Sequence, residues 1–532
     1  MLRRHTAIAL LVLAAQLGAG GPAAAEAGPR DGFDPSARSL ELRPRIATTA
    51  PSPGSRIEPA DTEQDPWVGT IARRLEALAA AARDHAAERP EHAATTDALL
   101  ERLRSLATTM HEDAALGIAV RDLSTGAPVF EWDASRSLNP ASNHKLLTAV
   151  AALELLGADY RWQTQVLRRG DQLVLVGEGD PSLQVGDIAA LADAVANAVD
   201  LSEIRGIVVD DTAFSSRRFG PGYDAQGPGF SYMAPSGALS LQWNTVEIEV
   251  KGAAKGHPVR IAVSPQCDHM EIRSTAKGGR GALSAQTWAH DEHTVVDVRG
   301  HLRAGTRYTK RRRVNDPGRF TASAFAAQLQ RHGAGPLKIV RGSAPPSAAL
   351  VATHRSAPLP EVLESALAYS NNFTTEQVLR TLGWRMSGEA GDWNNGHRAL
   401  ERYWEAAGLP LEALAFENAS GLSSVGRITA AALADLLAFA AREGSPAAAL
   451  WSALPVAGRE GTLRGRLRRS HGRVRAKTGT LRGASALSGV VEVKGGRRLG
   501  FSILVNGPVS ARRSRRLQDD VVMALLEHGA AG

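Results

Sequence analysis

Residues 138–156 read LNPASNHKLLTAVAALELL, and this stretch decides the fold prediction. Its apolar residues from Leu146 onward recur at helical spacing, so we expect a buried helix directly after the Pro-Ala pair. Ser142 then stands at the N-terminus of that helix, and Lys145 follows one helical turn later. Upstream, residues 116–132 hold two apolar runs separated by the turn sequence STGA, which predicts a β-hairpin leading into the helix.

The spacing of Ser142 and Lys145 suits nucleophilic catalysis. A serine hydroxyl is a poor nucleophile at neutral pH, and a lysine one turn away can accept its proton. A free lysine has a pKa of about 10.4 and would be protonated, so the arrangement also requires burial or a nearby positive charge. Lys477 is a candidate for that charge. The four-residue pattern alone also fits a helix cap followed by a solvated lysine.

Two further polar motifs follow in the chain. SNN occupies residues 370–372, and KTGT occupies residues 477–480, just before an apolar run that predicts a strand. Gly479 permits the backbone of a ligand to approach closely. The first motif alone would fit an exposed turn, and the second alone would fit a charged residue at the end of a strand. Neither interpretation explains why both motifs occur together with Ser142 and Lys145.

The three motifs in this order resemble the penicillin-recognising serine enzymes. The surrounding sequence resembles the class C low-molecular-weight penicillin-binding proteins, the D-alanyl-D-alanine carboxypeptidase and endopeptidase family. The resemblance covers roughly residues 112–528. Further family-like stretches are GDPSL at 179–183, DDTAF at 210–214, APS at 234–236, LSL at 239–241, TEQ at 375–377, SGLS at 420–423 and LPVAG at 454–458.

This resemblance implies a role for each motif residue. Ser142 would be the acyl acceptor and Lys145 its general base. Ser370 and Lys477 would assist proton transfer to the leaving D-alanine, while Asn372 would orient the substrate amide.

The resemblance also implies how substrate binds. The backbone N–H groups of Ser142 and Thr480 would form the oxyanion hole, and the hydroxyls of Thr478 and Thr480 would hold the terminal carboxylate, with Gly479 between them. The expected partners are peptidoglycan stem peptides, with β-lactam antibiotics as inhibitors that acylate Ser142.

The sequence departs from the family pattern at three positions. His144 stands where the family more often has a small or apolar residue, and we expect it to line the groove rather than to catalyse. Asn371 replaces an aspartate that is common in the wider superfamily. The family uses an aspartate before the APS segment to receive the amino group of the stem peptide's diamino acid, and Asp224 is the nearest candidate for that pocket.

The expected fold class is α/β (α+β), a penicillin-binding-protein/β-lactamase-like transpeptidase fold split by β-rich inserted domains. Strand-like runs separated by Gly-rich turns fill the insertion, and the helical stripes before it favour a helical hairpin packed on the main body over a coiled coil. The predicted segments are a signal peptide (1–25), a flexible linker (26–64), a helical N-terminal extension (65–110), a split serine peptidase domain (111–162 and 350–532) and inserted β-rich accessory domains (163–349).

The N-terminus and the composition suggest an exported, soluble protein. Two arginines precede an apolar run at residues 7–17, and AAA follows at residues 23–25, which is the layout of a cleavable signal peptide, so we expect a periplasmic or otherwise exported protein. The net charge of +7 favours an anionic partner. No aromatic residues interleave with the basic clusters, which argues against nucleic acid, and peripheral membrane contact stays open. Cys267 is the single cysteine, and neither a cofactor nor a metal site is predicted from the scattered histidines.

Two other functional classes fit parts of the sequence. A β-lactamase or esterase of the same fold would use the same motifs, but 228 positions separate Ser142 from Ser370, whereas a compact β-lactamase places them much closer. The second alternative is a non-catalytic protein that binds β-lactams or cell wall. The presence of every motif residue argues against such a loss of catalytic activity.

Overall fold

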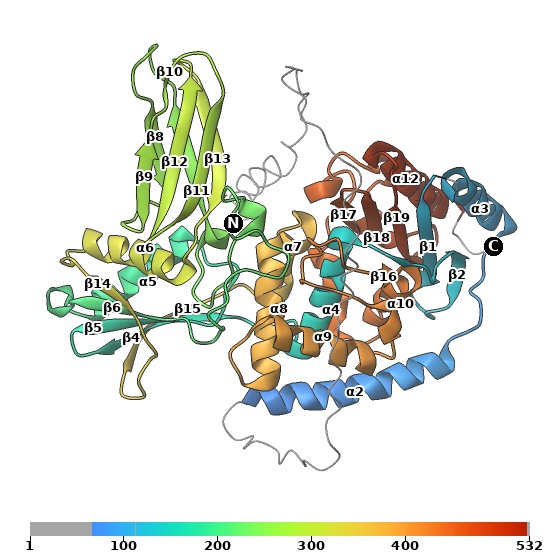
Figure 1. Ribbon diagram of the computed structural model, residues 1–532. Helices are drawn as coiled ribbons and strands as arrows, with labels where there is room; N and C mark the ends of the chain where they lie inside the picture. The colour runs from blue at the N-terminus through green and yellow to red at the C-terminus, as the bar shows by residue number, and fades with distance from the viewer. Residues whose placement is uncertain (1–65, 112, 529–532) are drawn as a thin grey trace, which may run out of the picture.

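A five-stranded antiparallel sheet lies at the centre of the half of the molecule that carries the three motifs (Figure 1). The computed structural model describes residues 66–111 and 113–528. Along β19, Phe501, Ile503 and Val505 pack into one core cluster, while Leu504 packs into another on the opposite face. The strands, in spatial order, are β17 (Val474–Leu481), β18 (Ala484–Glu492), β19 (Arg498–Asn506), β1 (Ala115–Asp122) and β2 (Pro128–Trp132).

Helices cover both faces of this sheet. Helices α3 (Asp97–His111) and α12 (Ala511–His528) pack together on one face. On the other face, α4 (Lys145–Leu156) follows the short 3₁₀ turn η1 (Ala141–His144) and is buried along its whole length. Around α4 lie α7 (Leu359–Ala368), α8 (Asn372–Ser387), α9 (Trp393–Ala406), α10 (Ala430–Ala440) and α11 (Leu450–Ala453), and the short strands β3 (Ser137–Leu138) and β16 (Ile428–Thr429) pair nearby.

The inserted residues form a second lobe with its own core. A mixed five-stranded sheet has the order β14 (Lys338–Arg341), β6 (Gly206–Asp210), β5 (Gln172–Gly177), β4 (Gln163–Arg169) and β15 (Ala349–Arg355). Above it in Figure 1 stands a β-rich unit made of β7 (Thr245–Lys251), β8 (Arg260–Ser264), β9 (Met270–Ser274), β10 (Lys277–Gly278), β11 (Leu283–His290), β12 (His293–Leu302) and β13 (Arg307–Arg313). Because β15 pairs with β4, the inserted sheet extends beyond residue 349, where the sequence suggested its end.

Two helices in the insertion were not anticipated. Helix α5 (Val185–Ala198) begins after Gln184, and α6 (Pro317–Arg331) begins after Asp316, whose side chain accepts a hydrogen bond from the Arg319 backbone N–H at 3.1 Å. The Asp-Pro pair is a standard helix start, an N-cap followed by proline at the first helical position. The mixed α/β fold class with a helix-flanked antiparallel sheet is confirmed.

The N-terminal extension is helical, but its two helices lie apart (Figure 1). Helix α2 (Pro66–Glu88) packs against α4, α8 and α9, whereas α3 packs against α12 and the hairpin of β1 and β2. Each helix therefore braces a different part of the main body rather than pairing with the other as a hairpin. The predicted signal peptide (1–25) and the whole of the predicted linker (26–64) lie outside the described residues.

Candidate active site

Ser142 lies in η1, immediately before α4. The preceding residue, Ala141, has a positive φ of 46°, and its backbone N–H donates to Asn139 Oδ1 at 2.8 Å. Asn143 Nδ2 donates to Ser488 Oγ at 2.7 Å, which ties η1 to strand β18. Side-chain hydrogen bonds on both sides thus hold the serine in a tight and partly strained turn.

Lys145 is fully buried and donates to three oxygen atoms. Its Nζ lies 3.0 Å from Ser142 Oγ, 2.8 Å from Asn372 Oδ1 and 2.6 Å from the Ser420 carbonyl oxygen. Burial lowers the pKa of Lys145 to about 7, while the negative charge of Glu376 acts in the opposite direction. Close to neutral pH, a large fraction of this lysine is therefore unprotonated and able to take a proton from Ser142.

Ser370 and Lys477 form a second serine–lysine pair. Ser370 has a positive φ of 59° in the turn between α7 and α8, and Lys477 Nζ donates to its Oγ at 3.0 Å and to the Thr478 carbonyl at 2.6 Å. Burial, and secondarily the charge of Lys145, hold the pKa of Lys477 well below its usual range. Two buried ammonium groups close together disfavour the state in which both are protonated.

The two asparagines of the second motif have different tasks. Asn371 is the N-cap of α8, and its Oδ1 accepts a long hydrogen bond from the Thr374 N–H at 3.4 Å. Asparagine and aspartate cap helices about equally well, which explains why asparagine is tolerated there. Asn372 receives the Lys145 ammonium on Oδ1 and donates through Nδ2 to the Tyr232 carbonyl at 2.9 Å, so both ends of its amide are engaged.

Strand β17 runs along the edge of the sheet beside η1. A Cβ on Gly479 would lie 2.6 Å from the Pro140 carbonyl oxygen, so only glycine allows the strand to approach this closely. The Thr478 hydroxyl donates to Thr462 Oγ1 at 2.7 Å, and Thr480 is exposed. As an edge strand, β17 leaves alternate backbone N–H groups unpaired by the sheet.

Glu376, which the sequence analysis assigned no role, organises the floor of the site. It is buried and accepts hydrogen bonds from the Tyr223 hydroxyl at 3.2 Å, Trp393 Nε1 at 2.8 Å and the backbone N–H groups of Ala419 and Ser420 at 3.2 and 2.9 Å. It therefore holds the Ser420 segment whose carbonyl receives Lys145. Its position four residues after Asn372 on α8, within the quoted TEQ stretch, is the signal that could have identified it.

Among the described residues, no hydrogen bond or ion pair joins the Asp224 side chain to the other predicted site residues. Its side chain is exposed, and Oδ1 accepts a hydrogen bond from the Gln226 N–H at 3.0 Å within the same turn. Arg313 holds this turn by donating to the carbonyls of Asp224 and Ala225 at 2.7 and 2.6 Å. Tyr223, the residue before Asp224, does reach the site through Glu376.

His144 is buried beside the catalytic pair. Its ring lies 5.4 Å from that of Phe416, and neither ring nitrogen has a hydrogen-bond partner among the described residues. Burial lowers its pKa to about 3, with smaller contributions from His397 and Lys145, so the imidazole is neutral near pH 7. These contacts favour packing over proton transfer.

A small pocket beside the site is lined by residues of both lobes. Asn371 and Asn372 come from α8, and the remaining residues come from the inserted lobe. The lining residues are Ser231, Tyr232, Trp243, Thr245, Arg311, Asn371 and Asn372. The insertion therefore forms part of the wall of the site.

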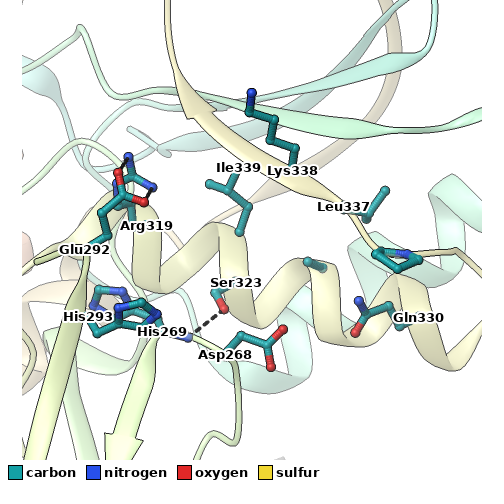
Figure 2. A pocket seen from close by; sticks show the side chains of 12 residues that line it. Asp268, His269, Glu292, His293, Arg319, Ser323, Gln330, Leu337, Lys338 and Ile339 are labelled. Carbon is teal, nitrogen blue, oxygen red and sulfur yellow. Dashed lines mark hydrogen bonds and ion pairs between the residues drawn. The ribbon is translucent and has the colours of Figure 1, made fainter.

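A larger cavity of about 360 Å³ lies elsewhere, between α6, β14 and the loops before β9 and β12. Figure 2 shows the Glu292 carboxylate against the Arg319 guanidinium, and His269 donating from its backbone to Ser323 Oγ at 3.0 Å. The predicted catalytic residues do not line it. Within the described ranges, no group of three or more His, Cys, Asp or Glu side chains could hold a metal ion.

Comparison with solved structures supports the fold. Penicillin binding protein 4 (dacB) from Haemophilus influenzae superposes with a TM-score of 0.67 at 21% identity, covering 79% of this chain and 99% of that one. A second structure of that protein, with a TM-score of 0.65, is complexed with a β-lactam.

Sequence comparison identifies the family. The D-alanyl-D-alanine carboxypeptidase of Actinomadura sp. (strain R39) is 34% identical over 475 residues, which cover 82% of this chain and 87% of that protein. Carboxypeptidase DacB of Mycolicibacterium smegmatis is 28% identical over 78% of this chain and 80% of its own length. The family model of the D-Ala-D-Ala carboxypeptidases 3 (S13) matches residues 99–527. The chain therefore belongs to the D-Ala-D-Ala carboxypeptidase 3 (S13) family.

Proposed function

We propose that this protein is a serine D-Ala-D-Ala carboxypeptidase and D-alanyl endopeptidase that acts on peptidoglycan stem peptides through an acyl-enzyme on Ser142. The observation that carries the proposal is the contact between Ser142 Oγ and the buried Lys145 Nζ at 3.0 Å, with the lysine's pKa lowered to about 7. Membership in the family supports the substrate class.

In acylation, Ser142 Oγ attacks the carbonyl carbon of the penultimate D-alanine while Lys145 takes the hydroxyl proton. The oxyanion that forms is stabilised by the backbone N–H groups of Ser142 and Thr480, a contribution of several kcal/mol. The C–N bond then breaks, and the proton held by Lys145 passes through the Ser370 hydroxyl to the leaving amine, which returns Lys145 to its neutral form; Lys477 contacts Ser370 Oγ at 3.0 Å. Asn372 holds Lys145 and orients the substrate amide.

Deacylation reverses the proton path. Water attacks the ester carbonyl and gives a proton to Lys145, the C–O bond to Ser142 breaks, and Lys145 passes that proton to Ser142 Oγ, which restores the hydroxyl. The terminal carboxylate of the substrate binds near the Thr478 and Thr480 hydroxyls during acylation, and its negative charge favours protonation of Lys477. Asp224 stays a prediction for the diamino-acid pocket. In this structure its Oδ1 accepts a hydrogen bond from the Gln226 N–H within the same loop.

β-Lactams are expected to acylate Ser142 as analogues of the dipeptide. We propose that the reaction takes place outside the cytoplasm, after the N-terminal segment has directed export of the protein. Peripheral membrane contact stays a prediction, and no described helix is both long and apolar enough to cross a bilayer.

The proposal is tested by incubating the purified protein with wall-derived muropeptides and measuring both free D-alanine and loss of cross-linked dimers. Release of D-alanine from pentapeptides reports carboxypeptidase activity, and conversion of dimers to monomers reports endopeptidase activity. The proposal predicts at least one of these products from wild type and neither from Ser142→Ala. Equal products from the two proteins would exclude it.

The β-lactamase alternative predicts a different lifetime for the adduct. A D-alanyl peptidase should hold its penicilloyl ester for minutes or longer, because its site is built to release peptide rather than penicillin. Turnover of penicillin many times per second would favour the β-lactamase. A stoichiometric burst without further turnover supports the peptidase.

A further inference from the structure

The positive charge of the chain is concentrated in two short segments. Residues 459–473 and 511–520 together carry ten arginines against three carboxylates, a net charge of +7. This equals the net charge of all 532 residues, so the rest of the chain is neutral on balance. We call these two segments the arginine surface.

The two segments lie side by side in the fold. Arg466 donates to Asp519 Oδ1 at 2.7 Å, to Gln518 Oε1 at 3.1 Å and to the Arg515 carbonyl at 3.3 Å, which joins the turn after η7 (Gly461–Leu463) to the first half of α12. The arginine surface is therefore continuous across two elements that are distant in sequence.

Most of its arginines have no acidic partner. Arg466, Arg513 and Arg516 form ion pairs. The other seven are exposed and have no ion pair with any acidic side chain of the described chain. A cluster of exposed guanidinium groups repels itself, and a bound polyanion relieves that repulsion.

The chemistry of the surface selects the type of polyanion. Guanidinium groups match phosphate oxygens with paired hydrogen bonds. The large exposed apolar residues of the described chain, Ile272, Leu350, Leu411 and Val425, all lie outside the two segments, which also contain no aromatic residue. A surface of this kind lacks the apolar face that anchors a helix in a membrane and the rings that stack on nucleic-acid bases.

The arginine surface begins at the edge of the catalytic site. Thr462 accepts the hydrogen bond of the Thr478 hydroxyl on β17, and the charge of Arg464 acts on Tyr369, the residue before Ser370. A linear polymer lying on the surface would pass beside the mouth of the site.

We propose that the arginine surface binds an extended phosphodiester polymer of the cell envelope and so holds the enzyme with its site facing the wall. The binding itself does not depend on catalysis. Only the cellular source of the polymer rests on the proposed function.

The test measures binding of the purified protein to poly(glycerol phosphate) at 50 and 200 mM NaCl. For about four phosphates neutralised, the affinity should fall roughly 50-fold between the two salt concentrations. The variant carrying Arg464→Gln, Arg468→Gln, Arg469→Gln and Arg473→Gln should bind about tenfold or more weakly than wild type at 50 mM NaCl.

A matched variant controls for net charge. It carries Arg260→Gln, Arg280→Gln, Arg303→Gln and Arg331→Gln, four exposed arginines of the inserted lobe, and should keep wild-type affinity. Equal weakening by both variants, or by neither, overturns the proposal. Binding to phosphatidylglycerol vesicles but not to the soluble polymer also overturns it, in favour of a membrane. The Ser142→Ala protein should bind like wild type, so loss of D-alanine release and loss of polymer binding are separate results.

Discussion

Lys145 donates to three oxygens that carry no formal charge: a hydroxyl, an amide and a backbone carbonyl. These acceptors orient the amine without stabilising its protonated form as strongly as a carboxylate contact would. Glu376 lies behind them and moderates the effect of burial. Lys145 is therefore held in place while its pKa is lowered to about 7.

The first prediction concerns the pH dependence of acylation. Because only neutral Lys145 can take the Ser142 proton, and its pKa is lowered to about 7, the acylation rate should rise roughly tenfold from pH 6 to pH 8 and then level off. Stopped-flow measurement with a fluorescent penicillin checks this. A rate that is flat or falling across this range contradicts the assignment. Lys145→Arg, which stays protonated, should be inactive throughout.

Glu376→Gln should move this profile to lower pH. Glu376 raises the pKa of Lys145, so removing its charge lets burial lower that pKa further. Both of its oxygens accept backbone N–H groups, so the amide should also cost about 1–3 kcal/mol in unfolding free energy. The control is Glu154→Gln, a buried carboxylate on α4 that accepts from Ser445 Oγ at 2.6 Å. A shift of the profile by both variants, or by neither, would count against the role of Glu376.

The motif residues could be predicted together because their types and order are distinctive. Lys145 hydrogen-bonds to Ser142 and Asn372, and Lys477 hydrogen-bonds to Ser370, so the structure brings these five residues together as a trio and a pair. Tyr223 and Tyr232 could not be predicted, because they lie in an irregular loop of the insertion without a periodic pattern. Asp224 lies in the same loop and stays a prediction for the diamino-acid pocket, since sequence position in a loop does not fix the direction of a side chain.

At the scale of elements, β17 and η1 must lie close enough for the oxyanion donors to converge. Gly479→Ala would place a methyl carbon 2.6 Å from the Pro140 carbonyl oxygen and push the strand outward. Losing one oxyanion donor costs about 10²–10³ in rate, so acylation should slow by roughly that factor. The control Gly186→Ala, on α5 with nothing within 4 Å, should acylate normally. Equal rates for both variants would show that this contact does not position the donors.

Element types were predictable where a single period dominated. The apolar run after Lys145 and the apolar run after residues 477–480 predicted helix α4 and strand β18, and the structure has both. Helices α5 and α6 were not predicted, because the many strand-like runs around them favoured β structure for the whole insertion. The Asp316-Pro317 pair carried the missing signal for α6.

At the scale of the whole molecule, the insertion and the N-terminal extension both support the catalytic lobe. Arg380 on α8 is buried and donates to the carbonyls of Gly391, Ser236 and Ser215 at 3.1, 3.1 and 2.8 Å, so it joins the helix that begins with Asn372 to the inserted lobe. The guanidinium also lies 4.5 Å from the centre of the Phe214 ring. The sequence predicted an insertion, but the contact between Arg380 and the inserted lobe could not be predicted, because the contacting residues are more than a hundred positions apart.

Helix α2 lies before the part of the chain matched by the family, and its docking can be tested directly. Ile71 is 0% exposed in the core cluster that includes α4, so Ile71→Ala should lower the unfolding free energy by about 2–5 kcal/mol in urea. Acylation without denaturant should be unchanged, since Arg74 of α2 contacts α4 at the Leu155 carbonyl, at the opposite end of that helix from Lys145. Glu76→Ala, exposed on the same helix, should cost less than about 0.5 kcal/mol. An equally small effect of Ile71→Ala would mean that α2 is not docked.

The role of Ser142 as the acylated residue is tested by mapping the penicilloyl adduct. Wild type and Ser142→Ala are incubated with penicillin, digested, and analysed by mass spectrometry, with thermal unfolding confirming that both are folded. We expect one adduct, on Ser142, in wild type and none in the variant. An adduct on another residue, or an equal adduct in Ser142→Ala, would contradict this role.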